Sequence, residues 1–317
     1  MHCSIVIRAY NEENRIGRLF AGISQQTLKD IEIILVDSGS TDGTTNIAAR
    51  YSIDGGMQVK ILHIKPDEFT FGYSLNQGIA AAQSELVVIA SAHVYPIYPD
   101  WLERLLAPFA NSKVALSYGK QRGNHSSIFS ERQIFTHWFP DQSRAIQTHP
   151  FCNNANAAIR RSLWEQHPYD ETLTGLEDLE WARWAMNQGH TISYVAEAEV
   201  VHVHDETPFA VYNRYRREAM TFKRIFPEEH FSLGNFFRLV IINIYNDMLN
   251  AAHQRELRAS LTSILWFRWM QFWGTYQGYL HSGPVTQQLR KTFYYPGDVH
   301  SVTTNQGRNV TPIRYIE

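Results

Sequence analysis

The sequence predicts an α/β protein in which a mostly parallel sheet is flanked by helices and is followed by a helical C-terminal region. Two observations predict this class. Near-continuous Val, Ile and Leu runs alternate with helical patterns over the first 120 residues, as in βαβ units. From about residue 207 onward the pattern becomes helical and aromatic. With 317 residues, 44% of them hydrophobic, the chain can bury a full core in one large domain or two smaller ones.

The β-rich runs and their capping residues place the elements of the first part. Thr41 and Asp42 are favoured N-cap residues, so a helix is expected to begin near them. Because ligands of such sheets sit beyond the carboxyl ends of the strands, the loops after residues 9, 37, 64 and 91 should line one site. Strands are expected at 3–9, 31–37, 58–64, 85–91 and 114–119, and further helices at 13–26, 74–83 and 99–109.

The second part of the chain is less regular before it becomes helical. Residues 121–155, rich in His, Ser, Gln and aromatic residues, are interpreted as an excursion that contacts an acceptor. A strand and a helix follow over 154–166, then a helix over 176–189, then an extended segment over 190–204. Helices are expected from residue 207 onward.

Charge and cysteine content exclude several classes of protein. The 29 Lys and Arg against 31 Asp and Glu, with a net charge of -2, provide no basic face for nucleic acid. Two cysteines, Cys3 and Cys152, form no disulfide framework and suit a reducing cytosol. The sequence shows no secretory leader, and the apolar stretches 236–249 and 263–280 are interrupted by polar residues. A cytoplasmic protein is therefore expected.

Three motifs occur in one order: "SIVIRAYNEENRI", "EIILVDSGSTDGT" and "LEDLEWARWAMNQG". Together they resemble the family 2 glycosyltransferases of the inverting GT-A type, over roughly residues 3–204. The resemblance implies a GT-A nucleotide-diphospho-sugar transferase domain at 1–205, with a nucleotide-binding half at about 1–120 and an acceptor half at about 121–205. Residues 206–317 would form a mainly helical extension. The resemblance also implies transfer of a sugar from a nucleotide donor to a hydroxyl of a glycan or lipid-linked acceptor, in bacterial surface polysaccharide assembly.

The first two motifs indicate a nucleotide site. Asp37 ends a buried strand, and "DSGSTDG" supplies small residues and backbone N–H groups at a helix N-terminus, which favours anions. The resemblance implies that Asp37 contacts the base and that the segment from Arg8 to Glu12 holds base and ribose. The alternative is that Asp37, Ser40 and Asp42 only cap a turn and a helix. The nucleotide-binding set of these two motifs is Ala9, Tyr10, Asn11, Glu12, Asp37, Ser38, Gly39 and Asp42.

A further block, "FTFGYSLNQGIAAAQSE", lies at 69–85. In the family that the chain resembles, a helix start here contacts the nucleotide or its phosphates. It makes Gly72, Ser74 and Asn76 candidates. A plain capped helix is the alternative.

The stretch "IASAHVYP" carries Ser91, Ala92 and His93 where GT-A enzymes usually carry D-x-D, which binds Mn²⁺ or Mg²⁺ on the donor diphosphate. It resembles the D-x-H of the polypeptide N-acetylgalactosaminyltransferases, with Ser91 in place of Asp. In "VVHVH", His202 and His204 alternate and so point the same way. The favoured hypothesis is a Mn²⁺ site of His93 with His202 or His204, because imidazole suits Mn²⁺ better than Mg²⁺. The alternatives are a metal-independent site, in which His93 donates to the diphosphate, and a structural His93. Ser91 and Ala92 are counted with the nucleotide-binding residues.

"GLEDLE" provides the catalytic carboxylates. Glu177, Asp178 and Glu180 lie at a helix start, whose dipole is expected to lower their pKa values and keep them ionised. The family resemblance implies that Asp178 is the base that deprotonates the acceptor hydroxyl and that Glu177 binds the acceptor or orients the site. The alternative is that these acids only stabilise the first turn of the helix.

The nucleotide, the acceptor and the role of the C-terminal helices remain open in the sequence. UDP is the family's commonest donor nucleotide, and GDP, dTDP and CMP are alternatives. The helices could rest on the inner face of the membrane, pack on the catalytic domain or form a homodimer, and "TFYYPGD" could reach back over the site. Two other functions were weighed. One is a non-catalytic relative that binds nucleotide sugar or glycan. The other is a sugar-1-phosphate nucleotidyltransferase. Such an enzyme needs a Gly-rich loop with Arg or Lys directly after the first strand, and "RAYNEEN" is not such a loop.

Overall fold

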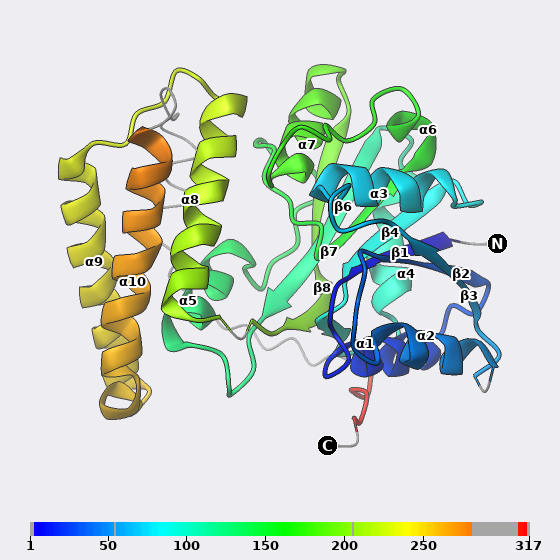
Figure 1. Cartoon of the computed structure of the whole chain (residues 1–317), viewed down its shortest axis with the longest axis horizontal. Helices are drawn as coiled ribbons and strands as arrows, with labels where there is room; N and C mark the ends of the chain where they lie inside the picture. The colour runs from blue at the N-terminus through cyan, green and yellow to red at the C-terminus, as the bar shows by residue number, and fades with distance from the viewer. Residues whose placement is uncertain (1–2, 54, 205, 281–309, 316–317) are drawn as a thin grey trace.

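The computed structural model describes residues 3–53, 55–204, 206–280 and 310–315. An eight-stranded sheet in the order β3-β2-β1-β4-β7-β6-β8-β5 forms its centre (Figure 1). The strands are β1 (Cys3–Ala9), β2 (Ile31–Asp37), β3 (Gln58–His63), β4 (Leu86–Ser91), β5 (Val94–Pro96), β6 (Val114–Arg122), β7 (Asn156–Arg160) and β8 (Thr191–His202).

The sheet is parallel in its first half and mixed in its second. Strands β3, β2, β1 and β4 run parallel, and their register pairs Ala9 with Asp37, Asp37 with His63 and Arg8 with Ser91. The ends of these strands therefore meet at one edge, as the sequence predicted. Strand β7 runs antiparallel to β4 and β6, and β5 runs antiparallel to β8, but β6 and β8 run parallel, so the sheet is mostly parallel as predicted, with its antiparallel pairs in the second half.

The helices follow the predicted pattern with shifted ends, except that α5 forms within the 121–155 segment, for which no helix was predicted. Helix α3 begins before the predicted residue 74, because the Thr70 hydroxyl caps it by accepting from the Tyr73 N–H at 3.0 Å. The helices of the α/β part are α1 (Ile16–Ser24), α2 (Thr44–Ile53), α3 (Phe71–Ala80), α4 (Trp101–Leu106) with the 3₁₀ turn η1 (Ala107–Ala110), α5 (Phe129–Trp138), α6 (Arg161–Trp164) and α7 (Glu177–Asn187).

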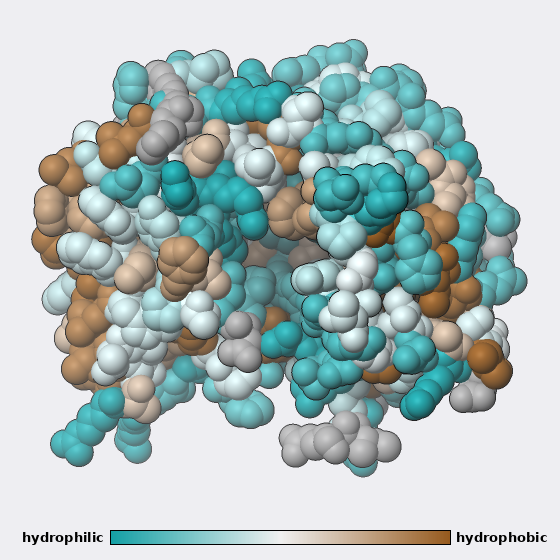
Figure 2. Space-filling model, in the orientation of Figure 1, coloured by the Kyte–Doolittle hydropathy of each residue, from teal (hydrophilic) through white to brown (hydrophobic). Residues whose placement is uncertain are grey.

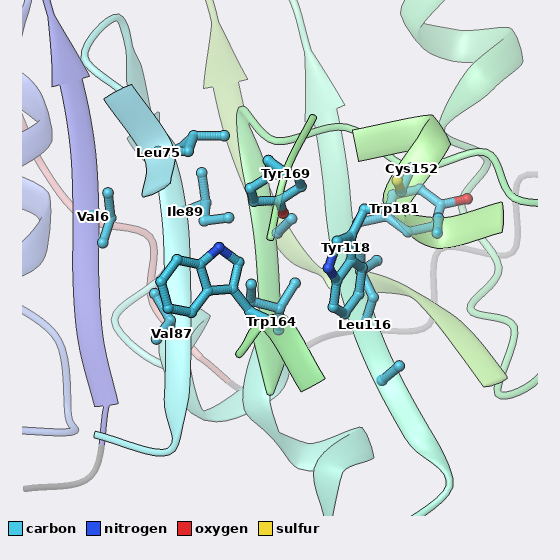
Figure 3. Packing of buried hydrophobic residues seen from close by; sticks show 14 of the residues in the cluster. Val6, Leu75, Val87, Ile89, Leu116, Tyr118, Cys152, Trp164, Tyr169 and Trp181 are labelled. Atoms are coloured by element: carbon cyan, nitrogen blue, oxygen red, sulfur yellow. The ribbon is translucent and has the colours of Figure 1, made fainter. Parts of the chain in front are cut away.

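Apolar side chains cover both faces of the sheet. On one face Val6, Ile89 and Leu116 pack with Leu75 of α3 and Trp181 of α7 (Figure 3). On the other face a second cluster joins the sheet to α1, α2 and α4. Because strands buried on both faces need apolar residues at consecutive positions, these strands read as continuous runs in the sequence.

Three helices form a layer beside the α/β part: α8 (Pro208–Ile225), α9 (Leu233–His253) and α10 (Leu257–Leu280) (Figure 1). A buried ion pair fixes this layer, since the Arg268 Nε lies 2.7 Å from the Asp247 Oδ2. The Ser130 hydroxyl of α5 donates to the same carboxylate at 2.6 Å, which ties the layer to the catalytic part.

The predicted domain boundary at 205/206 falls between the end of β8 at His202 and the start of α8 at Pro208. The segment "TFYYPGD" lies outside the described residues. After it, the Ile313 N–H donates to the Ile97 carbonyl at 2.8 Å, and Tyr315 packs against Tyr95. None of the helices described here is long and apolar enough to cross a membrane.

Candidate active site

The loops after β1 and β2 are bonded to each other at the carboxyl edge of the sheet. The Asn11 N–H donates to the Ser40 hydroxyl at 2.9 Å, and the Asn11 side-chain oxygen accepts from the Thr41 N–H at 2.8 Å. Asn11 holds a left-handed conformation, with φ 53°, that Asn tolerates better than most residues. These contacts build one wall from the two predicted nucleotide motifs.

The Asp37 carboxylate is buried in this wall. It accepts from the Ser40 N–H at 3.2 Å and from the Gly39 N–H at 3.3 Å, and it lies 3.2 Å from the His63 Nδ1. Asp42 caps α2 by accepting from the Thr44 N–H at 3.0 Å. The turn and helix contacts given as the alternative for these residues are therefore present.

Four of the predicted nucleotide-binding residues are turned away from the open edge. Ala9 and Ala92 are buried in the cluster on the α1 face, so their side chains are part of the core. The Ser38 hydroxyl donates a hydrogen bond to the Ala9 carbonyl at 3.1 Å. A Cβ on Gly72 would lie 2.7 Å from the Asp170 carbonyl oxygen, so this glycine is required by the packing of α3. In contrast, the Tyr10 ring is 56% exposed.

Asn76 belongs to the fold rather than to the open edge. Its Nδ2 donates to the Tyr169 carbonyl at 3.0 Å and to the Glu171 carboxylate at 2.8 Å. Its Oδ1 accepts from the Trp164 indole at 2.9 Å and from the Tyr169 N–H at 3.1 Å. These bonds use every donor and acceptor of the amide, so Asn76 has none left for a nucleotide.

We therefore expect Asn76→Ala to destabilise the protein by about 2 to 4 kcal/mol, because it leaves buried partners unsatisfied. Denaturant unfolding measures this loss. The exposed Asn250, whose amide donates to Gln133 at 3.0 Å, provides the control Asn250→Ala, with an expected change below about 0.5 kcal/mol. A folded Asn76→Ala protein with weakened nucleotide binding and unchanged stability would contradict the structural role.

The three predicted metal-binding histidines come together. One ligand atom each of His93, His202 and His204 lies within 4.8 Å of the other two. The ring centroids of His202 and His204 are 4.2 Å apart, and those of His93 and His202 are 5.0 Å apart. The favoured hypothesis paired His93 with one of the two others, whereas the structure brings all three to one place.

Each imidazole is held through its Nδ1. The partners are Glu12 Oε1 for His93, Gln121 Oε1 for His202 and Glu131 Oε1 for His204, each at 2.7 Å. Because these oxygens accept, each neutral ring carries its hydrogen on Nδ1 and has a lone pair on Nε2. This is the outer arrangement that orients metal-bound histidines in proteins. The Nε2 of His93 lies 3.1 Å from the Ser91 hydroxyl, which can donate to it.

The residues fit a divalent cation that prefers nitrogen ligands. The His202 Nε2 is buried and has no hydrogen-bond partner among the described residues. Burial, with positive neighbours, holds the pKa values of His202 and His204 well below their usual range, so both rings are neutral and able to bind a metal. Three imidazole nitrogens suit Mn²⁺ or Zn²⁺ better than Mg²⁺ and leave coordination positions for a ligand.

Gln121 and Glu131 were missed by the sequence analysis. Glu131 lies in the first turn of α5, where an acid is common, and Gln121 is a polar residue near the end of an apolar strand. Only the pairing of β6 with β8 brings Gln121 next to the histidine strand. Glu131 also accepts from Arg214 at 3.2 Å. Arg214 also pairs with Glu206, so this single guanidinium contacts both carboxylates of the neighbouring trio of Glu131, His204 and Glu206.

Glu177 and Asp178 lie at the start of α7, after two residues with positive φ, Gly175 and Leu176. The Asp178 carboxylate accepts from the Asn154 N–H at 3.0 Å and from the Leu179 N–H at 2.8 Å. The Glu177 carboxylate lies 3.8 Å from the Arg8 guanidinium. Both carboxylates are buried.

The expectation that the helix dipole keeps Asp178 fully ionised is wrong. Burial, together with the adjacent Glu177 carboxylate, raises the pKa of Asp178 to about 7. The N–H donors of Asn154 and Leu179 and the positive charge of Arg8 only partly offset this rise. A carboxylate with a pKa near neutrality suits a general base.

Helix α8 holds the loop that leads into α7. The Thr221 and Thr174 hydroxyls are 2.9 Å apart, and Arg224 donates to the Thr172 hydroxyl at 2.6 Å. Arg217 lies over the Phe71 ring, with 4.9 Å between its guanidinium carbon and the ring centroid. The C-terminal layer therefore contacts the loop that precedes Glu177 and Asp178. Figure 2 shows the surface hollowed between this layer and the α/β part.

The fold is shared with nucleotide-sugar enzymes of the GT-A class. A mannosyltransferase from Pyrobaculum calidifontis, solved in complex with GDP-Man and Mn²⁺, superposes with a TM-score of 0.60 and 18% identity, over 88% of this chain and 85% of that chain. Residues 1–349 of Staphylococcus aureus TarS, solved with UDP, superpose with a TM-score of 0.56 and 17% identity, over 98% of each chain. These likenesses show a GT-A fold.

The sequence comparisons identify the family. The model of Glycosyl transferase family 2 matches residues 4–167, and the chain belongs to this family of glycosyltransferases. The O-antigen chain rhamnosyltransferase WbaN of Salmonella anatum is 29% identical over 67% of this chain and 69% of its own length. The rhamnosyltransferase RfbN of Salmonella typhimurium is 26% identical over 68% of this chain and 70% of its own. The predicted family and enzyme class are thus confirmed.

Proposed function

We propose that this glycosyltransferase transfers a sugar from a nucleotide donor to a hydroxyl of a glycan or lipid-linked acceptor, with inversion at the anomeric carbon. The observation that carries this proposal is the buried pair of Glu177 and Asp178 on α7, at the edge where the nucleotide loops and the histidines meet. An inverting reaction needs one base on the acceptor side and no covalent sugar intermediate. The Asp178 environment suits that base.

Asp178 takes the proton of the acceptor hydroxyl as the hydroxyl oxygen attacks the anomeric carbon. The bond between that carbon and the donor phosphate oxygen breaks, and the nucleotide leaves with the electron pair. Glu177 and Arg8 orient the acceptor side of the site. The N–H groups of Asn154 and Leu179 fix the Asp178 carboxylate, which keeps its reactive oxygen in one position.

The donor lies against the loops after β1 and β2. Asp37 and Asn11 contact the base and ribose, and the exposed Tyr10 ring packs on the base. His93, His202 and His204 would hold a divalent cation, Mn²⁺ in the first instance. Such a cation, when bound, neutralises the negative charge that builds up on the leaving diphosphate. Glu12 links the loop after β1 to the histidine cluster, because its carboxylate accepts a hydrogen bond from His93.

The relatives guide the choice of substrate. Two of them are named as O-antigen chain rhamnosyltransferases, so a deoxyhexose donor and a growing bacterial polysaccharide are the first pair to test. Relatives of the same fold were solved with GDP-Man and with UDP, so nucleotide identity requires a panel of UDP, GDP, dTDP and CMP sugars. We place the reaction in the cytoplasm, at the inner face of the membrane.

The test is nucleotide release from each donor, with polysaccharide fragments as acceptors and product stereochemistry followed by NMR. Release that depends on acceptor and gives the inverted anomer supports the proposal. Retained configuration would refute the inverting mechanism. Tight binding of a nucleotide without turnover for any acceptor would favour a non-catalytic relative.

The pH dependence of kcat/KM reports the base. Because only ionised Asp178 accepts a proton, the rate is expected to rise about tenfold per pH unit below about 7 and to level off above it. The Glu180→Gln variant should show the same profile, since Glu180 pairs with His167 at 3.2 Å. A midpoint near the ordinary value of 3.8 would contradict a buried, raised Asp178.

A further inference from the structure

The Phe71 ring at the start of α3 contacts two arginines that come from different parts of the fold. The guanidinium carbon of Arg8, near the end of β1, lies 4.8 Å from the ring centroid, and that of Arg217 on α8 lies 4.9 Å from it. Guanidinium groups at this distance are attracted to the negative face of an aromatic ring. One ring therefore holds two positive charges where the α/β part meets the C-terminal layer.

Arg217 differs from Arg214 and Arg224, which lie on the same side of α8. Arg214 pairs with two carboxylates, and Arg224 donates to the Thr172 hydroxyl. Arg217 forms no hydrogen bond or ion pair with the residues that the structure describes, and its Nε is buried. It acts on the adjacent Glu218 carboxylate only at longer range. Because a buried charged donor without an acceptor is costly, a ligand with acceptor oxygens is expected beside Arg217.

Both arginines lie next to the turn that carries the catalytic carboxylates. The Arg8 Nη1 is 3.8 Å from the Glu177 carboxylate. A Cβ on Gly175 would lie 3.8 Å from the Arg217 Nε, so this side chain lies against the backbone just before α7. In the proposed reaction Glu177 and Asp178 act on the acceptor, whereas the three histidines act on the donor diphosphate. A ligand of the two arginines therefore belongs to the acceptor.

The chemistry of the two guanidinium groups selects the kind of ligand. The Arg8 Nη1 is buried and, like the Arg217 Nε, has no hydrogen-bond partner among the described residues. Each guanidinium presents N–H groups in a planar fork that matches phosphate oxygens, and one phosphate has oxygens enough for both. We propose that Arg217, together with Arg8, binds a phosphate group that the acceptor carries near its reacting hydroxyl. This inference rests on the proposed function and adds a phosphate-bearing acceptor to it.

The test is equilibrium dialysis of the full chain against labelled glucose 1-phosphate, without nucleotide and again with Mn²⁺ and saturating UDP, GDP, dTDP or CMP. Glucose 1-phosphate is expected to bind at least about tenfold more tightly than methyl glucoside, which lacks the phosphate. Arg217→Gln should weaken its binding at least about tenfold. Phe71→Leu keeps an apolar side chain but removes the ring that holds both guanidinium groups, so about a threefold loss or more is expected.

The matched control is Arg216→Gln. It removes the same charge from the same helix, but adjacent residues of a helix point to different sides, so glucose 1-phosphate binding should be unchanged. Circular dichroism checks that all variants are folded. Equal binding of glucose 1-phosphate by the Arg217→Gln and unmodified proteins would overturn the proposal, as would an equal loss in Arg216→Gln.

The nucleotide distinguishes the two sources of phosphate. Binding of glucose 1-phosphate that survives saturating nucleotide, with unchanged nucleotide affinity in Arg217→Gln, supports an acceptor site. Displacement by nucleotide, with weaker nucleotide binding in Arg217→Gln, would assign Arg217 to the donor diphosphate and overturn the proposal. Glucuronate that binds as tightly as glucose 1-phosphate would also overturn it, in favour of a carboxylate site. A chain that binds glucose 1-phosphate through Arg217 but binds no nucleotide would refute the proposed transfer while supporting the phosphate site.

Discussion

Replacing Asp178 with Asn is expected to lower the rate of sugar transfer by about 10²- to 10⁴-fold while nucleotide binding is retained. Asn keeps the shape of the side chain, and its oxygen still accepts one N–H bond, but it cannot take a proton from the acceptor. The donor loops lie on the other motifs of the site, so their contacts with the nucleotide are unchanged. Steady-state turnover and calorimetric nucleotide binding measure the two effects separately.

The same helix offers a matched control for Asp178→Asn. Glu180 is also an acid of the first turn of α7, but it pairs with His167 away from the Glu177 and Asp178 pair. Glu180→Gln should change kcat less than about threefold, because it removes only a surface ion pair. If Asp178→Asn turned over at the original rate, Asp178 would be a first-turn acid of purely structural importance, and the proposed base would have to be abandoned.

The His93→Ala variant is expected to lose at least about 100-fold in Mn²⁺ affinity, because three imidazoles become two. Direct titration of the protein with Mn²⁺, followed by electron paramagnetic resonance, measures this loss without an activity assay. Glu131→Gln keeps all three ligands but weakens the hydrogen bond that orients His204, so about a 10- to 100-fold loss is expected. Calorimetry with nucleotide in the presence of Mn²⁺ or EDTA then shows whether the donor needs the cation.

His167→Ala is the control for the histidine variants. The His167 side chain is 33% exposed and that of His93 is 25% exposed, and both pair with a carboxylate, but His167 lies against Trp184. The Mn²⁺ affinity of the His167→Ala protein should equal that of the unmodified chain. Nucleotide binding that is indifferent to EDTA and is still lost in His93→Ala would establish the alternative, in which His93 donates to the diphosphate directly. Equal Mn²⁺ binding in all variants would refute the histidine site.

The C-terminal layer gives the catalytic loop its position. Thr221 and Arg224 of α8 hold the loop before Glu177, and Arg217 packs over Phe71. The family match ends at residue 167, so the layer lies outside the part of the chain that it covers.

Local patterns determined the elements, the family and the outline of the site. Asp37 could be placed because a parallel strand ends with it, and the histidine pair because alternate residues of a strand share a face. Helix α3 shows where local signals fell short: it was expected from residue 74, whereas the Thr70 hydroxyl accepts from the Tyr73 N–H and the helix starts at Phe71.

Long-range contacts decided the rest. Sequence order cannot show that β7 reverses direction between β4 and β6, nor that Gln121 and Glu131 lie behind His202 and His204. The sequence made Asn76 a candidate ligand residue, but its amide is hydrogen-bonded to Tyr169, Trp164 and Glu171. Charge depends on surroundings too. The sequence alone places Asp178 at a helix start and so identifies it as the candidate base. Its raised pKa comes from burial beside Glu177, which only the tertiary structure provides.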